Sequence, residues 1–364
     1  MSHERARSAD LVGAGLIVLA AACFGTLGPL SRYADDAGVS SLALVFWRGS
    51  LGAGCMVLFI AARWAVLRRG VVPLRQVPVR DRWFMAAAAV ANTILNLAVF
   101  VAFLRISIAL ALLVFYLYPA FVALISVTWL GERLDRIRWA ALVMSLAGMV
   151  LVVAGAGDLG QLDGLGIGLS FVGALGQTFY VLAARYGFAH VPGAQAAALT
   201  MGGAATLYLL IAVAIGALGQ LAVPAQSAAA LWPVLLAGLV GAGVPTVTYI
   251  TGIRRLGAPR AAILANFEPV VGVALAALLL AERPAPLQLL GGALIIGSGV
   301  VLQLRPRAGP PNTKPWLNRR SWTKPLQAAE AREDGTNPVR PNAICPLRIT
   351  EPNRGDGVRC RPSW

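Results

Sequence analysis

Two ionisable side chains lie deep inside long apolar stretches and are the first candidates for chemistry. Glu268 stands ten residues after Ala258, which a helix would convert to roughly 15 Å from the start of its run. A carboxyl group at that depth in a membrane is costly and by default indicates a functional site. Glu268 is therefore a candidate proton carrier or amine-binding group. The alternative is a structural carboxylate held by hydrogen bonds or by an arginine.

Arg48, in the stretch FWRGSLG, is the second buried charge. Its planar guanidinium suits a carboxylate or a phosphate of a bound solute. It could equally serve as the counter-ion of Glu268, or extend along its own stem to the membrane surface. The sequence leaves these three interpretations open.

Neutral polar residues supply a weaker set of candidates within the apolar runs. Asn92 and Asn96 share a helix face, and so do the pairs Gln177 with Tyr180 and Thr246 with Tyr249. Polar side chains of this kind often only join helices, at about 0.6 kcal/mol each. As a set, we expect them to line a central cavity. The predicted binding residues are Glu268, Arg48, Tyr116, Asn92, Asn96, Gln177, Tyr180, Tyr249 and Asn266.

No catalytic residue, metal site or cofactor is predicted, and we expect the protein not to be an enzyme. The two histidines, His3 and His190, have no metal-ligand spacing. We find neither a nucleophile elbow nor a phosphate-binding loop. An intramembrane enzyme would need a convergent acid, base or metal set, and Glu268 is the single acid that the apolar runs contain.

The composition indicates how these residues are held. Hydrophobic residues make up 58% of the 364 residues and charged residues 13%, far from the ordinary globular balance. Apolar runs long enough to cross a bilayer recur along the chain. The net charge of +15 does not indicate nucleic-acid binding, because the basic residues flank apolar runs. The expected environment is the lipid bilayer.

Ten membrane-spanning helices are predicted. Arginines concentrate in alternate loops, and such loops are usually cytoplasmic. We therefore expect both termini to lie in the cytoplasm. The expected location is the inner membrane of the cell. The ten expected spans are residues 11–30, 42–62, 83–104, 107–130, 139–155, 165–184, 194–219, 231–253, 261–280 and 287–304.

The chain is a doubled unit: residues 105–150 recur at residues 255–300, an offset of 150 positions without a gap. Pro119 matches Pro269, and Glu132 matches Glu282. Five spans per half is an odd number, so the second half must cross the membrane in the opposite sense. Inverted repeats of this kind are typical of secondary transporters. We interpret the two prolines and two glutamates as structural motif residues.

The doubled pattern resembles the EamA repeat of the drug/metabolite transporter superfamily. The resemblance rests on a mid-run proline, an apolar run closed by GE or AE, and a Gly-rich span ending GMVLVV or GVVLQL. It implies an all-α integral membrane fold of two inverted five-helix repeats, with alternating access. It also implies export of small organic metabolites, such as amino acids, coupled to protons. Tyr118 stands where the second half has Glu268, so an acidic role rests on one half.

These observations predict a secondary transporter of small molecules with no nucleic-acid partner, and they do not fix its oligomeric state. The alternatives are an exchanger of phosphorylated or nucleotide-linked solutes and a non-transporting receptor or scaffold. The predicted parts are a cytoplasmic N-terminus (1–10), a first repeat (11–155), an inverted second repeat (165–304) and a disordered, basic, cytoplasmic tail (305–364).

Overall fold

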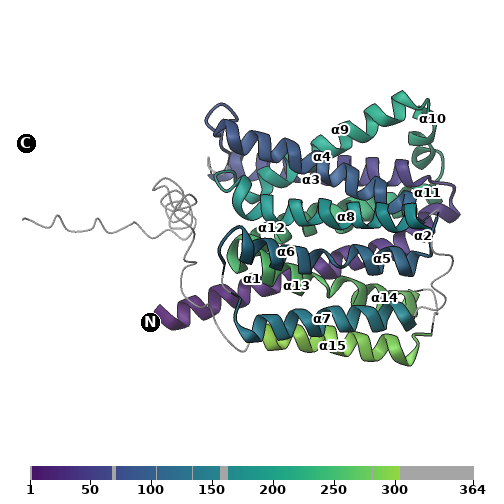
Figure 1. The fold of residues 1–364 in the computed structure, drawn as a ribbon. Coiled ribbons are helices and arrows are strands. Elements are labelled where there is room, and N and C mark those ends of the chain that lie inside the picture. The colour runs from purple at the N-terminus through teal and green to yellow at the C-terminus, as the bar shows by residue number, and fades with distance from the viewer. Residues whose placement is uncertain are drawn as a thin grey trace, which may run out of the picture. The chain divides into compact units, whose positions relative to one another are not determined.

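The computed structural model describes residues 2–67, 71–103, 105–132, 134–155, 163–279 and 283–303. Within these ranges the secondary structure is entirely helical (Figure 1). Nine helical stretches among the described residues are long and apolar enough to cross a membrane, and a shorter apolar helix near the end of the second half supplies the tenth span. The predicted ten-helix membrane fold is confirmed. The tail expected from residue 305 onward, Arg133 and Glu282 lie outside the described residues.

The first repeat contains five spans; the first candidate span begins at Asp10, close to the predicted residue 11, within a helix that starts at Ser2. The spans are α1 (Ser2–Gly25) with α2 (Leu27–Asp36), α3 (Ser41–Leu67), α4 (Val79–Phe103), α5 (Ile108–Phe115) with α6 (Tyr118–Thr128), and α7 (Arg136–Gly155).

The second repeat has the same order. Its spans are α8 (Gly164–Leu182) with the π-helical turn η1 (Ala183–Gly187), α9 (Gly193–Ala214), α11 (Ala228–Gly238) with η3 (Leu239–Gly243) and α12 (Val244–Leu256), α13 (Ala258–Ala265) with α14 (Glu268–Leu279), and α15 (Pro286–Gln303). The short helices α10 (Leu218–Leu221) and η2 (Val223–Ala225) lie in the connection before α11.

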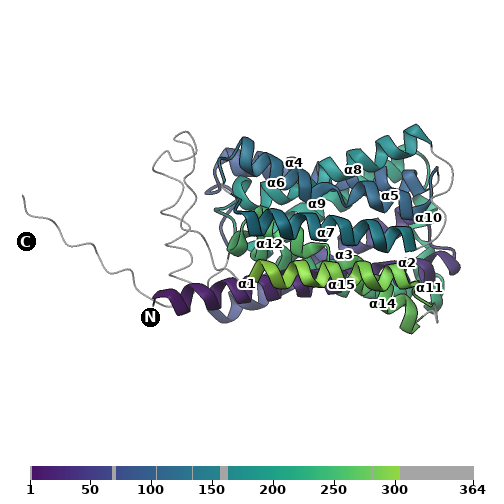
Figure 2. The same cartoon turned by 60° about the horizontal axis from the view of Figure 1, so that its bottom comes forward.

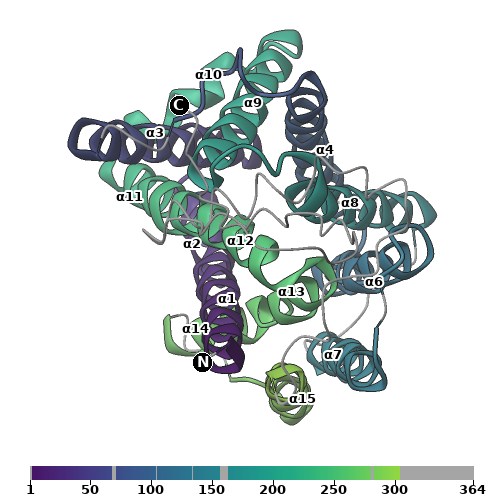
Figure 3. The same cartoon turned by 90° about the vertical axis from the view of Figure 1, so that its left-hand side faces the viewer.

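The helices pack with an approximate twofold relation between the repeats. Equivalent spans contact one another directly, as α3 does with α9, α6 with α13, and α7 with α15. The contact of α1 with α12 in turn corresponds to the contact of α8 with α4. Figure 3 shows α7 and α15 together at the edge of the bundle, while α12 lies near its centre. The other helices are therefore the ones that can surround a central site.

The two mid-run prolines interrupt one span in each repeat. Pro119 is the second residue of α6 and Pro269 the second residue of α14. Proline lacks a backbone N–H. It is tolerated in the first turn of a helix, because the N–H groups there have no carbonyl partner within the helix. Each span is thus divided into two half-helices, α5 with α6 and α13 with α14. The N-terminus of the second half-helix is placed inside the bundle.

The peripheral helices α7 and α15 lie side by side (Figure 2) and approach most closely where Gly148 meets Gly291. A Cβ built on Gly148 would lie 2.6 Å from the carbonyl oxygen of Gly291, and one built on Gly291 would lie 2.4 Å from that of Gly148. Glycine at both positions lets the two backbones touch, which is how small residues associate helices in lipid. This pair therefore forms a compact structural unit.

The ends of the spans define two faces of the bundle. We name the face that carries the start of α1, the end of α12 and the turn η1 the amino-terminal face, and the other end the opposite face (Figure 1). At the amino-terminal face, Arg260 donates to Asp10 at 2.9 Å and both side chains are buried. At the opposite face, Arg105 contacts Asp163 at 3.1 Å in a more exposed position.

Asp163 also begins α8, because its side chain accepts a hydrogen bond from the Leu165 amide at 3.1 Å. The hydrogen bond from Arg105 and this capping bond lower the pKa of the Asp163 carboxyl group. Both interactions favour the charged form of the side chain.

Candidate substrate cavity

A cavity of about 140 Å³ lies between the two repeats. Its wall combines aromatic, aliphatic, amide and charged side chains from both halves of the chain. The lining residues are Phe24, Leu27, Val45, Arg48, Gly49, Asn92, Leu95, Asn96, Phe115, Tyr118, Gln177, Tyr180, Thr200, Met201, Ala204, Tyr208, Gly241, Ala242, Thr246, Tyr249 and Glu268.

The cavity follows the internal repeat. Several lining residues form pairs that are 150 positions apart, so each half contributes equivalent positions to the wall. The two members of each pair are different residue types. The pairs are Asn92 with Ala242, Asn96 with Thr246, and Tyr118 with Glu268. The duplicated backbone therefore builds a symmetric space whose polar groups are distributed unequally.

Glu268 is the first residue of the half-helix α14. Unpaired amide groups and the helix dipole make such an N-terminus favourable for a carboxylate. Close approach of α1 is possible because residue 25 is glycine: a Cβ there would lie 2.9 Å from the Glu268 carbonyl oxygen. Tyr116 lies beside the carboxyl group, and Arg48 is near enough for the two charges to interact. Glu268 is thus held by a helix break that its own neighbour Pro269 creates.

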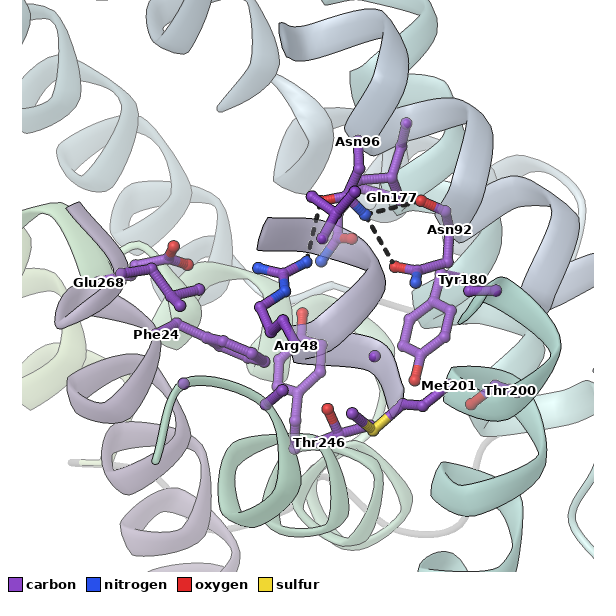
Figure 4. Close-up of a pocket in the computed structure, with 18 of the residues that line it drawn as sticks. Phe24, Arg48, Asn92, Asn96, Gln177, Tyr180, Thr200, Met201, Thr246 and Glu268 are labelled. Carbon is purple, nitrogen blue, oxygen red and sulfur yellow. Dashed lines mark hydrogen bonds between the residues drawn. The ribbon is translucent and has the colours of Figure 1, made fainter. Parts of the chain in front are cut away.

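Arg48 lies across the cavity on α3, with its guanidinium group in the space between Glu268 and Asn96 (Figure 4). Its Nη2 donates to the Asn96 carbonyl oxygen Oδ1 at 3.0 Å. The Asn96 amide in turn donates to the backbone oxygen of Asn92 at 2.7 Å. Tyr208 on α9 donates to that same oxygen at 3.4 Å. This network orients Arg48 inward, so the snorkelling interpretation does not describe its position.

The remaining wall is largely aromatic. Phe24 and Tyr249 meet edge to face with ring centroids 6.1 Å apart. The Tyr249 hydroxyl is buried near Tyr118 and Gln177, yet it makes no hydrogen bond of normal geometry with the described residues. A buried hydroxyl without a partner is costly. It is therefore available to a group that enters the cavity.

The structure brings seven of the nine predicted binding residues to this wall. These are Glu268, Arg48, Asn92, Asn96, Gln177, Tyr180 and Tyr249. The other two lie just behind it. Tyr116 packs among Phe115 and Tyr118, with ring centroids 5.3 and 6.4 Å away. Asn266 is fully buried and donates to Ser145 on α7 at 2.8 Å, so it joins two helices.

Sequence reasoning missed several lining residues in α9. Tyr208, Thr200 and Met201 all line the cavity, but the apolar run around them showed no pair of polar residues at helical spacing. The signal that Tyr208 offered was a hydroxyl in the middle of a span, which needs a partner. Its partner is the Asn92 backbone oxygen, on a distant helix.

The closing motif of the first repeat has an identifiable contact. Glu132 accepts a hydrogen bond from the Tyr186 hydroxyl in the turn η1. Glu132 lies beyond the end of α6, and η1 is the end of span six, so the bond joins the two spans at the amino-terminal face. Its counterpart Glu282 lies outside the described residues.

Similar proteins agree with this architecture. An "Uncharacterized transporter" of Archaeoglobus fulgidus is 28% identical over 298 residues, covering 80% of this chain and 96% of that protein. The "Uncharacterized transporter YxxF" of Bacillus subtilis is 24% identical over 298 residues, covering 81% and 90% respectively.

One solved structure, titled "Crystal structure of protein", has the same fold, with a TM-score of 0.64 at 23% identity. It covers 82% of this chain and 96% of that chain. Residues 11–154 and 164–304 each match the EamA-like transporter family. The two matches include all the cavity-lining residues and the helix breaks at Pro119 and Pro269. The chain belongs to the EamA-like transporter family and is a multi-pass membrane transporter.

Proposed function

We propose that this protein is a proton-coupled exporter of small organic metabolites, such as amino acids and related compounds, that works by alternating access. The observation that carries the proposal is the cavity between the inverted repeats, with Arg48 and Glu268 on its wall. A site built from both halves gives a solute contacts with each, which is the arrangement that rocking of two repeats requires.

The charges of the cavity support this class of solute. Arg48 offers two-pronged hydrogen bonds to a carboxylate, and the amides of Asn92, Asn96 and Gln177 add neutral donors and acceptors. The Glu268 carboxylate can either take up a proton or form an ion pair with a protonated amine. Phosphorylated solutes fit less well, because Arg48 is the one cation among the lining residues.

The proposed orientation places the amino-terminal face in the cytoplasm of a cell with an inner membrane. Support comes from the arginines of that face, since basic residues accumulate in cytoplasmic loops. Arg254, Arg255 and Arg260 all lie at this face, whereas Asp36 and Asp163 end or begin spans at the opposite face. In this orientation export proceeds from the amino-terminal face to the opposite face.

The test is transport by the purified protein in proteoliposomes loaded with a pooled metabolite extract. A pH gradient is imposed, and the compounds released from the proteoliposomes are identified by mass spectrometry. We expect gradient-dependent release of a few chemically related compounds. Release without dependence on the gradient would replace proton coupling by facilitation or exchange. A folded preparation that releases nothing would favour a scaffold.

The role of Glu268 is tested by Glu268→Gln, which keeps the shape of the side chain and removes its titration. We expect flux to persist at most weakly and its dependence on pH to disappear. Asp36→Asn is the matched control, because it removes one carboxylate from an exposed position and should leave both properties intact. Unchanged pH dependence in Glu268→Gln would refute the assignment of the proton to this residue.

A further inference from the structure

The end of the cavity nearest the amino-terminal face is closed by buried side chains. Tyr180 and Tyr249 line the cavity on α8 and α12, and one helical turn beyond them lie Ala184 and Ile253, each 0% exposed. Phe188, also fully buried, continues this apolar layer. A solute in the cavity therefore meets a packed core on its way to the amino-terminal face. Exchange with that side requires this layer to open.

The turn η1 (Ala183–Gly187) lies in the middle of this closure and departs from regular helix. The Phe188 amide donates to the Ala183 oxygen at 3.3 Å, which closes a π-helical turn. Such turns are rare and are frequently found at functional sites. Gly187 allows η1 to lie directly on Phe84 of α4, because a Cβ there would come within 2.8 Å of that ring.

Hydrogen bonds from three side chains hold the turn and the segment after it. Tyr186 donates to Glu132 beyond the end of α6, and Arg185 donates to the backbone oxygen of Arg254 on α12. Arg254 returns hydrogen bonds to the backbone oxygens of Val191 at 2.7 Å and Phe188 at 2.8 Å. Together these contacts connect the end of span six to spans four and eight.

The opposite face has a contact in the corresponding place. Span one is the repeat equivalent of span six, and span nine that of span four. Tyr33, near the end of α2, donates to the Leu279 backbone oxygen at the end of α14 at 3.3 Å. Each face therefore joins the same pair of equivalent spans through a tyrosine hydroxyl. Two equivalent closures at opposite ends of one cavity are what alternating access requires.

We propose that η1 is the gate of the amino-terminal face, kept shut by the Tyr186–Glu132 bond and the Arg254 contacts, and that Tyr33 on Leu279 closes the opposite face. This inference rests on the proposed function. The two closures compete: weakening one shifts the population of the transporter toward opening at that face. The motif glutamate Glu132 thereby acquires a role in the conformational cycle.

The experiment measures access to the cavity from each face. The four native cysteines are replaced, and Thr246→Cys places a single thiol on the cavity wall. Vesicles of both orientations are treated with a small charged methanethiosulfonate reagent that does not cross the membrane. Tyr186→Phe should raise the labelling rate from the amino-terminal face about tenfold, as expected for losing a hydrogen bond to a carboxylate, and lower it from the opposite face.

Tyr33→Phe should shift labelling in the reverse direction, toward the opposite face. Thr206→Val is the matched control, because its hydroxyl bonds within its own helix, to Gly202 at 2.9 Å, and its loss should change neither rate. Where Tyr186→Phe does not fold, Glu132→Gln weakens the same bond and should give a smaller shift in the same direction.

Equal rates in Tyr186→Phe and the parent, or an equal rise at both faces, would overturn the gate. Labelling does not depend on knowing the substrate, so the two proposals fail separately. A shifted labelling pattern in a protein that exports nothing keeps the gate and refutes the transport assignment. Export with unshifted labelling keeps the function and refutes the gate.

Discussion

The crossing of α7 and α15 gives a sharp prediction about stability. Ala at position 148 would place its Cβ 2.6 Å from the Gly291 carbonyl oxygen, whereas ordinary contacts begin near 3.4 Å. The neighbouring atom is backbone and cannot rotate away, so the helices must separate. Overpacking of this kind costs about 1–3 kcal/mol. We therefore expect Gly148→Ala to lower the thermal midpoint Tm of the detergent-purified protein by about 2–12 °C.

Gly168→Ala supplies the matched control for this prediction. Gly168 is exposed within α8, and a Cβ there would meet nothing within 4 Å. The chemical change is the same, but here the gain in helix propensity, up to about 1 kcal/mol, is unopposed. We expect Gly168→Ala to leave Tm unchanged or to raise it.

The assay is thermal unfolding followed by circular dichroism, with flux measured below Tm. Because α7 and α15 contribute no lining residue, Gly148→Ala should retain transport wherever it is folded. A Tm for Gly148→Ala equal to that of Gly168→Ala would refute the argument from backbone contact. Gly148→Ala with Gly291→Ala should cost less than the sum of the two, since both relieve the same crossing.

Three further predictions concern other contacts. Gly25→Ala should displace the start of α14, slow transport several-fold and also lower Tm, because its Cβ would lie 2.9 Å from the Glu268 carbonyl oxygen; flux and Tm measured together check this. Asp10→Asn should destabilise by about 3–5 kcal/mol by leaving Arg260 buried without its partner, and Asp10→Leu with Arg260→Met should recover most of that loss in thermal unfolding. Asp163→Asn keeps the helix cap and removes the charge, and it should lower Tm near pH 7. The pKa of Asp163 is lowered in the folded protein, so its stabilisation is present above the unfolded value of 3.8 and is lost as pH falls through the folded value; a Tm difference that persists at lower pH would contradict this.

The architecture could be predicted from the sequence because it depends on periodic and repeated sequence features. Apolar runs of membrane length predicted ten spans, and the repeated prolines and glutamates predicted a doubled unit. Depth along the run placed Glu268 near the middle of the bundle. Each of these inferences uses one segment at a time, or compares two segments at a fixed offset. None requires knowing which helices touch.

The details of the site depend on contacts between distant helices, and here prediction stopped. Asn266 and Tyr116 were predicted to line the cavity, but both lie behind its wall, and Asn266 is turned toward Ser145 on α7. Arg260 read as a loop residue, and only folding shows that it is buried against Asp10. The position of Arg254 likewise depends on its hydrogen bonds to the backbone oxygens of Phe188 and Val191, which lie in a distant segment of the chain. Spacing along one helix carries no information about such partners.

Under the proposed proton coupling, the unequal distribution of polar groups over the repeated positions sets a thermodynamic limit on transport. Tyr118 occupies the position equivalent to Glu268, so the described cavity wall has one titratable carboxyl group. A cycle that carries one proton on Glu268 receives about 1.4 kcal/mol per pH unit, together with about 2.3 kcal/mol per 100 mV for each charge that moves. Each pH unit then supports roughly a tenfold solute gradient. An acid in both halves would double the driving force available per solute; with one acid, the proposed cycle uses one proton.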